Sequence, residues 1–203
     1  MIVEDHAILT QSLSLGLRLE GMEPYVAARL DERSVLAEAR RLRPHLVLLD
    51  LHLGGEGDAL PMIGALTASG IQVLVLTGST DEGVHGTALD AGAVSVLHKG
   101  ESLDKLFQNI RDVVDGHMVM RPARRDELLQ HGRRRSAIEA KLRSLSPRET
   151  EVLGALIEGR SAETIASEQF VSLGTVRSHI RSILRKLGVT SQLAAVAAAR
   201  CSG

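Results

Sequence analysis

The chain has 203 residues, a length that provides for one or two domains, each with its own hydrophobic core. No apolar run is long enough to span a bilayer, and the single cysteine, Cys201, excludes an internal disulfide, so we expect a soluble, untargeted protein of the cytoplasm. The formal net charge of −1 conceals an asymmetry. Lys+Arg number 9 against 17 Asp+Glu in residues 1–116, 8 against 3 in residues 117–143, and 7 against 5 in residues 144–203. A basic back half favours nucleic acid as a partner.

In residues 1–116, apolar runs typical of strands alternate with amphipathic helical patterns. Strands are expected at residues 1–3, 25–28, 45–50, 71–77 and 93–97, and helices at residues 6–20, 32–43, 60–68, 82–91 and 103–114. Five strands alternating with five helices predict an α/β fold with a doubly wound, five-stranded parallel sheet. Helices are expected on both faces of that sheet.

The strand expected over residues 45–50 ends abruptly in Asp50, at the carboxyl edge of the sheet, where ligands gather in open α/β folds. The other strands end at the same edge in acidic, hydroxyl and basic side chains: Glu4 and Asp5, Thr77, and Lys99. Three crowded carboxylates repel one another unless a hard divalent cation, most plausibly Mg²⁺, lies among them. Each residue alone has an ordinary explanation as a helix cap or a solvated loop side chain. Together they favour a metal and phosphoryl site.

The order and spacing of these residues resemble the receiver domain of two-component response regulators. The resemblance implies that Asp50 takes a phosphoryl group from the phosphohistidine of a sensor histidine kinase. It implies that Mg²⁺ is held by three side chains and one backbone carbonyl: Glu4, Asp5, Asp50 and the carbonyl of His52. It also implies that Thr77 and Lys99 bind the phosphoryl oxygens and report the modification, which biases a two-state arrangement of loops and helices.

Three features depart from the receiver pattern. Val96 stands three positions before the lysine, where receivers usually carry an aromatic or histidine switch residue, so coupling through a swinging ring is not expected. The loop over residues 53–58 contains glycines in place of the usual Met-Pro-Gly turn, and we expect them to supply the same turn. The first strand has only three residues before Glu4, which is short for a central strand and favours a natural start upstream of Met1.

Residues 117–143 form a predicted linker that is helical in part. It contains a basic cluster at Arg133, Arg134 and Arg135. A solvated linker helix is the favoured interpretation of this cluster, and a patch that contacts phosphates is the alternative.

Residues 144–203 carry the pattern of a small all-α domain with a helix-turn-helix. Serine N-caps predict three helix starts, at Ser146, Ser161 and Ser172, and the first forms a capping box that includes Glu149. The helix expected from Ser172 to about residue 187 has apolar residues on one face. The other face carries three arginines in register, Arg177, Arg181 and Arg185. Such a helix, second in a tight pair, suits the major groove of DNA.

The segments LSPRETEVL at residues 145–153, TVRSHI at residues 175–180 and LRKL at residues 184–187 closely resemble the LuxR-type helix-turn-helix. A receiver followed by this module is the architecture of the NarL/FixJ family of transcriptional regulators. The resemblance implies base contacts by Arg177, Ser178 and Arg181, and contacts nearer the DNA phosphates by Thr175, His179 and Lys186. The expected last helix, residues 191–200, serves dimerisation in the family, and ordinary helix packing is the alternative.

The sequence therefore predicts a transcription regulator without enzymatic activity that binds double-stranded DNA as a homodimer and is switched by phosphorylation of Asp50. A DNA-binding regulator that never needs phosphorylation is an alternative, which Val96 and the short first strand favour slightly. A more remote alternative is an aspartyl-phosphate enzyme of the haloacid dehalogenase class. That class requires a second aspartate two residues after the first, where this chain has His52.

Overall fold

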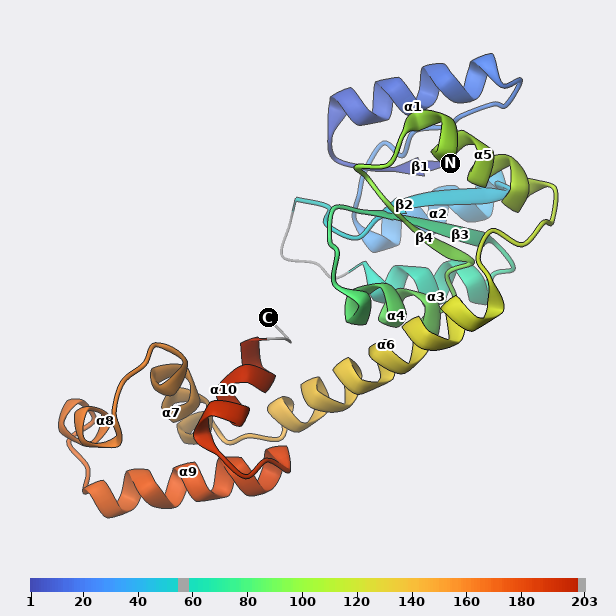
Figure 1. Ribbon diagram of the computed structural model, residues 1–203. Helices are drawn as coiled ribbons and strands as arrows, with labels where there is room; N and C mark the ends of the chain where they lie inside the picture. The colour runs from blue at the N-terminus through green and yellow to red at the C-terminus, as the bar shows by residue number, and fades with distance from the viewer. Residues whose placement is uncertain (55–58, 201–203) are drawn as a thin grey trace. The chain divides into compact units, whose positions relative to one another are not determined.

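The computed structural model describes residues 1–54 and 59–200 (Figure 1). Cys201 and most of the glycine-rich turn expected over residues 53–58 lie outside the described residues. The chain divides into two compact units, Met1–Arg133 and Arg134–Gly203. The predicted boundaries at residues 116 and 143 differ from this division, because the helix between the domains contributes to both units.

The first unit is built on a sheet of parallel strands, β1 (Ile2–Val3), β2 (Leu46–Asp50), β3 (Gln72–Thr77) and β4 (Ser95–His98), in the order β1-β2-β3-β4. The fifth strand expected over residues 25–28 is instead a single bridge between Val26 and Ile2. This correction has a simple cause. Because β1 is only two residues long, it offers the neighbouring segment one pairing position before the chain turns away at Glu4.

The order of the strands reverses beside β1. Val26, which follows β1 in the chain, pairs on one side of it, and β2 pairs on the other. The carboxyl ends of β1 and β2 therefore flank the topological switch point of a doubly wound sheet, where ligands bind in such folds. Glu4 and Asp5 follow β1 at this point, and Asp50 ends β2.

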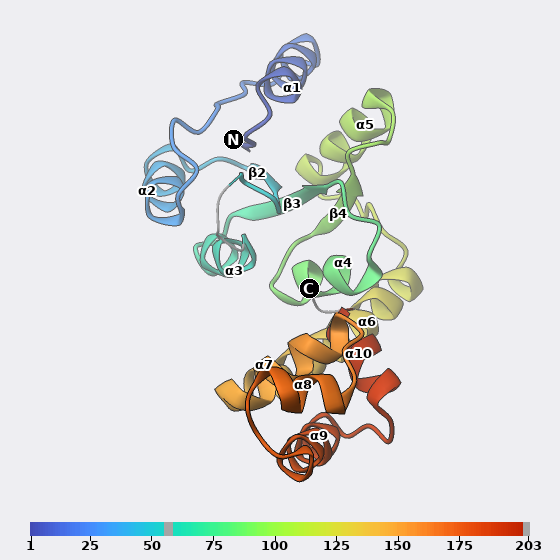
Figure 2. The same ribbon diagram turned by 90° about the vertical axis from the view of Figure 1, so that its left-hand side faces the viewer.

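Helices cover both faces of the sheet, as the alternation of strands and helices predicts (Figures 1 and 2). Their bounds are α1 Ala7–Leu19, α2 Glu32–Leu42, α3 Leu60–Ala68, α4 Glu82–Asp90 and α5 Leu103–Val114. One core lies between the sheet and α2, α3 and α4, and a second lies between the sheet and α1 and α5. Successive residues of β2 alternate between the two cores, because neighbouring strand side chains point to opposite faces.

Helix α6 (Pro122–Arg143) covers most of the predicted linker. Its first part packs on the first unit, where Leu128 is buried in the core formed with α2, α3 and α4. The backbones of α6 and α4 meet at two glycines: a Cβ on Gly86 would lie 1.9 Å from the carbonyl oxygen of Leu128, and a Cβ on Gly132 would lie 2.3 Å from the carbonyl carbon of Gly86. The first part of α6 is therefore packed helix, whereas the interpretation of the basic cluster Arg133, Arg134 and Arg135 as a solvated face stays a prediction.

The second unit contains α7 (Pro147–Ile157), α8 (Ala162–Glu168), α9 (Leu173–Leu187) and α10 (Gln192–Arg200) around one core. The predicted N-caps Ser146, Ser161 and Ser172 each accept a hydrogen bond from the backbone three residues on, and the capping box of Ser146 and Glu149 is formed. Among the described residues, no helix combines the length and apolarity that a membrane span requires.

Candidate functional site

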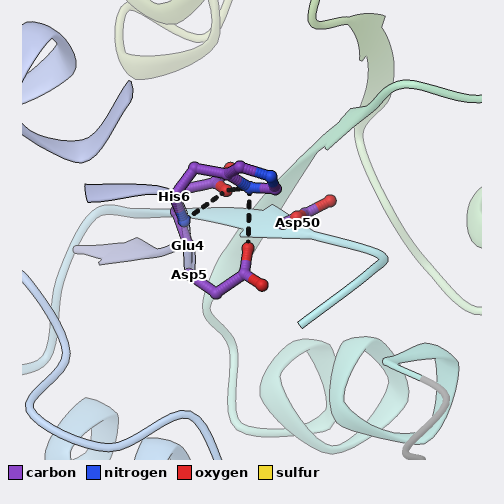
Figure 3. Close-up of side chains that lie close together, drawn as sticks. All are labelled: Glu4, Asp5, His6 and Asp50. Atoms are coloured by element: carbon purple, nitrogen blue, oxygen red, sulfur yellow. Dashed lines mark hydrogen bonds and ion pairs between the residues drawn. The ribbon is translucent and has the colours of Figure 1, made fainter. Parts of the chain in front are cut away.

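Three carboxylates meet at the switch point of the sheet (Figure 3). Carboxylate oxygens of Glu4, Asp5 and Asp50 and a ring nitrogen of His6 all lie within 4.8 Å of one another. Glu4 and Asp50 are buried, whereas Asp5 is more exposed. The structure thus brings together the acidic residues that the sequence singled out, from segments 45 residues apart or more in the chain.

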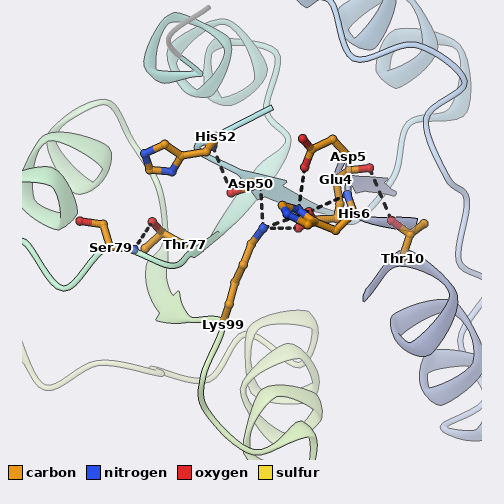
Figure 4. A network of polar contacts seen from close by, with 9 residues as sticks. All are labelled: Glu4, Asp5, His6, Thr10, Asp50, His52, Thr77, Ser79 and Lys99. Atoms are coloured by element: carbon orange, nitrogen blue, oxygen red, sulfur yellow. Dashed lines mark hydrogen bonds and ion pairs between the residues drawn. The ribbon is translucent and has the colours of Figure 1, made fainter. Parts of the chain in front are cut away.

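Lys99 joins the acidic cluster from the end of β4 (Figure 4). Its Nζ lies 2.7 Å from Oδ2 of Asp50 and 2.9 Å from Oε1 of Glu4. Desolvation lowers the pKa of Lys99, but hydrogen bonds and charge interactions with Asp50 and Glu4 outweigh it and raise the pKa overall. The lysine is therefore a fixed positive charge beside Asp50, close to where a phosphoryl group on that residue would lie.

His6 also belongs to the cluster, and sequence reasoning missed it. Its Nδ1 lies 2.7 Å from Oε1 of Glu4 and 2.8 Å from Oδ1 of Asp5 (Figure 3). The hydrogen bond with Glu4 and the charge of Asp5 raise the pKa of His6. The signal in the sequence was its position immediately after the acidic pair.

The remaining predicted residues of this edge lie around the cluster. Thr77 is buried and its Oγ1 accepts a hydrogen bond from the amide of Ser79 at 3.0 Å, while its carbonyl accepts from the amide of Lys99 at 2.8 Å (Figure 4). The backbone amide of His52 donates to Oδ1 of Asp50 at 3.1 Å. Val96 is buried in β4 beside Val75, and its side chain has no polar atom.

The donor set of this edge fits a hard divalent cation. It consists of three carboxylates within reach of one another, and oxygen ligands are those that Mg²⁺ prefers. A single lysine does not neutralise three carboxylates, so a cation would relieve the remaining repulsion.

In the second unit, α9 has the two faces that the sequence predicts. Its apolar residues form part of the core: Val176, Ile180, Ile183 and Leu187 are buried. Thr175, Arg177, Ser178, Arg181 and Arg185 are exposed, and His179 is half-buried. Arg177 lies 3.5 Å from Glu163 of α8, a long, exposed contact that leaves its guanidinium accessible.

Lys186 differs from the other predicted DNA contacts because its ammonium has partners inside the domain. Nζ lies 2.7 Å from Oε2 of Glu149 and 3.0 Å from the carbonyl oxygen of Ser144. The hydrogen bond from Lys186 and that from the amide of Ser146 hold the pKa of Glu149 at about 2. Sequence reasoning missed this pairing, which joins the start of α7 to the end of α9. A contact between Lys186 and DNA remains a prediction.

Family models match both units. Residues 1–111 match the response regulator receiver domain, and residues 143–199 match the bacterial regulatory proteins of the luxR family. The chain is a response regulator. It belongs to the NarL/FixJ type, whose members join these two domains, and it is a DNA-binding transcriptional regulator of a two-component system. The dehalogenase alternative is therefore rejected.

Curated relatives of this response regulator cover nearly the whole chain. It is 34% identical to the nitrate/nitrite response regulator protein NarP of Escherichia coli over 96% of this chain and 91% of that protein. It is 30% identical to the response regulator protein VraR of Staphylococcus aureus over 97% of this chain and 93% of that protein. A solved structure of the response regulator RcsB in complex with DNA matches with a TM-score of 0.56 and 22% identity, covering 100% of this chain and 97% of that one, which supports the fold.

Proposed function

We propose that this response regulator is switched by phosphorylation of Asp50, with a sensor histidine kinase as the phosphoryl donor. The observation that carries the proposal is the contact of Asp50 with Lys99 at the switch point of the sheet, beside Glu4 and Asp5. A carboxylate oxygen of Asp50 forms the new bond to phosphorus while the phosphorus–nitrogen bond of the kinase phosphohistidine breaks, and the histidine nitrogen leaves with the bonding electron pair.

The residues around Asp50 have separate tasks in this proposal. Glu4, Asp5, Asp50 and the carbonyl of His52 hold Mg²⁺, which neutralises charge on the transferred phosphoryl group when it is bound. Lys99 exchanges its contact with the carboxylate for one with a phosphoryl oxygen, and the hydroxyl of Thr77 donates to another. The oxygen of that hydroxyl can still accept from the amide of Ser79 while its proton is donated, which links the phosphorylated site to the loop that leads into α4.

We further propose that phosphorylation promotes a homodimer that places two α9 helices in successive major grooves of DNA, in the cytoplasm. Arg177, Ser178 and Arg181 face base edges, and Thr175, His179 and Lys186 lie nearer the phosphates. The exposed apolar side chains Ile8, Leu15 and Leu19 of α1 offer a surface on the receiver for pairing of two copies. RcsB, a structural relative, has been solved as two dimers bound to DNA, which supports a dimer here.

Intact-protein mass after incubation with a small-molecule phosphodonor and Mg²⁺ tests the acceptor. We expect one phosphoryl adduct on the wild type and none on Asp50→Asn, because the amide is not a nucleophile for this transfer. A wild-type sample without Mg²⁺ is the control and should remain unmodified. A folded wild-type protein that forms no adduct, or an adduct that persists in Asp50→Asn, would contradict the assignment.

A regulator that binds DNA without phosphorylation is the second candidate function. The observation in its favour is Val96, a buried hydrocarbon at the position where receivers usually carry a switching ring. The two candidates differ in one measurement, the DNA affinity of the wild type with and without the adduct. An unchanged affinity together with an unchanged oligomeric state on gel filtration would favour the second candidate.

A further inference from the structure

Figure 1 shows the turn between α8 and α9. This turn contains a phenylalanine, Phe170, in a backbone conformation that normally belongs to glycine. Helix α8 ends in a Schellman motif, in which the amide of Phe170 donates to the carbonyl of Ser167 and the amide of Val171 donates to the carbonyl of Ala166. Phe170 occupies the left-handed position of this motif, with φ +53°. The side chain at this position is forced close to its own backbone, which costs free energy in any residue except glycine.

The same chain shows how it otherwise builds this motif. Six other described helices end with the same pair of hydrogen bonds, and in each the left-handed position is glycine: Gly21, Gly70, Gly92, Gly116, Gly159 and Gly188. Glycine thus serves the turn at each of the other described helix ends with this pair of bonds, whereas α2 ends differently, in a left-handed Arg43 whose amide donates to the carbonyl of Ala39. Because the fold of the turn itself does not require a phenylalanine, the side chain of Phe170 needs another explanation.

The side chain of Phe170 has no packing role within its own domain. It is 95% exposed, whereas Phe107, the other phenylalanine of the chain, is buried in the receiver core. In the isolated domain this residue has two unfavourable features: its backbone is strained, and its apolar ring is exposed to water. Strained residues of this kind gather where a protein contacts a ligand or partner, which points to a binding partner for the ring of Phe170.

Phe170 lies two residues before Ser172, the N-cap of the recognition helix α9. The N-terminal residues of a recognition helix contact base edges, so the turn that leads into it passes beside the DNA backbone at the border of the groove. Most protein–DNA contacts at such borders are made to phosphate and sugar. A phenyl ring has no hydrogen-bonding group or charge for a phosphate, but it matches the apolar face of a deoxyribose.

We propose that the ring of Phe170 packs against a deoxyribose at the border of the groove that α9 enters, and so positions the recognition helix on the duplex. The inference rests on the proposed insertion of α9 into the major groove. A sugar contact is independent of base sequence and neutralises no phosphate. It contributes to the affinity for any duplex and leaves the dependence of affinity on salt concentration unchanged.

The full-length protein and a mixed-sequence DNA duplex at low salt provide the test. We expect Phe170→Gly to bind the duplex about three- to tenfold more weakly than the wild type, since apolar contact area is lost. Its slope of affinity against salt should equal that of the wild type, and its melting temperature should be equal or higher, since glycine relieves the strain. Phe170→Leu, which keeps an apolar side chain on the strained backbone, should retain most of the affinity.

Arg43→Gly is the matched control, because Arg43 is the other non-glycine residue with positive φ among residues 1–54 and 59–200 and it lies in the receiver. It should leave DNA affinity unchanged. Wild-type affinity in Phe170→Gly, alongside a loss in Arg181→Ala, would overturn this inference alone and turn attention to a protein partner. A loss accompanied by a changed salt slope or a lower melting temperature would also overturn it. A wild type that binds no duplex would overturn it together with the proposed DNA contacts.

Discussion

At the scale of single residues, side chains of this protein form pairs between residues that lie far apart in the sequence. Lys99 contacts Glu4 and Asp50, which are 95 and 49 residues away, and Lys186 contacts Glu149, which is 37 residues away. The residue types and their strand-end positions allowed us to predict that the first group would meet. The pairing of Lys186 with Glu149 was not predicted, because the capping box already explained the position of Glu149.

Glu149 gives a prediction at this scale. Its pKa is lowered from 4.5 to about 2, so the folded state holds fewer protons than the unfolded state and gains stability above pH 4.5. That stability should be lost as the pH falls from about 5 toward 2. We expect Glu149→Gln to destabilise the DNA-binding domain by about 1–3 kcal/mol at pH 7 and to weaken this acid dependence, as measured by urea denaturation across pH.

Glu151→Gln on the same helix is the matched control. Glu151 is about half exposed and pairs only with Arg148 on the helix surface among its described contacts, so its loss should change stability by less than about 0.5 kcal/mol. Equal effects of the two substitutions would contradict the role assigned to Glu149.

At the scale of elements, the packing of α6 on α4 depends on two glycines that lack side chains. Gly86 and Gly132 bring the two helix backbones into contact, and ion pairs flank the crossing, with Arg124 2.6 Å from Glu82 and Arg133 3.7 Å from Asp90. The sequence predicted a helix here correctly. It did not predict the partner, because a glycine within a helix looks like a weak point until the opposite surface is known.

Gly132→Ala tests the crossing. The new methyl group would overlap the backbone of α4, so the first part of α6 must move away and the receiver should lose about 1–3 kcal/mol of stability. Gly64→Ala in α3 is the control, because the nearest atom to its new methyl group would lie 3.9 Å away. Gly64→Ala should raise the free energy of unfolding by about 0.5–1 kcal/mol. Thermal denaturation followed by circular dichroism compares the stabilities of the two variants. A Gly132→Ala variant as stable as the wild type would exclude a tight crossing of α6 and α4.

At the scale of the whole molecule, the charge asymmetry along the sequence follows the division of the chain into two units. The acidic part of the chain forms the receiver, and the residues with excess positive charge begin at α6. Sequence composition alone placed the end of the receiver near residue 116. The structure extends the first unit to Arg133, because Leu128 belongs to its core.

This extension predicts how fragments should behave. A receiver fragment that ends at residue 133 should be more stable than one that ends at residue 116, by about 2–4 kcal/mol, since the shorter one exposes the surface that Leu128 covers. Urea denaturation of the two fragments measures the difference. The longer fragment with Leu128→Ala is the control and should lose much of the advantage. Equal stability of the two fragments would contradict the assignment of this segment to the receiver.

The sequence by itself determined the local features of this protein and the family to which it belongs. Helix starts at Ser146, Ser161 and Ser172, the buried strand that ends in Asp50, and the two-faced helix α9 all follow from patterns within a few residues. Such features depend on backbone hydrogen bonds and on periodicity, which neighbouring residues set.

Only the tertiary structure decided which distant groups meet and which side chains remain without a place in a core. The pairing of Lys186 with Glu149, the inclusion of Leu128 in the receiver and the exposure of Phe170 depend on how the helices pack. No local pattern contains that information, since a side chain has the same identity whether it faces a core, a partner or water. The phenylalanine in place of the usual glycine indicates a binding contact only in combination with the exposure of its ring to solvent.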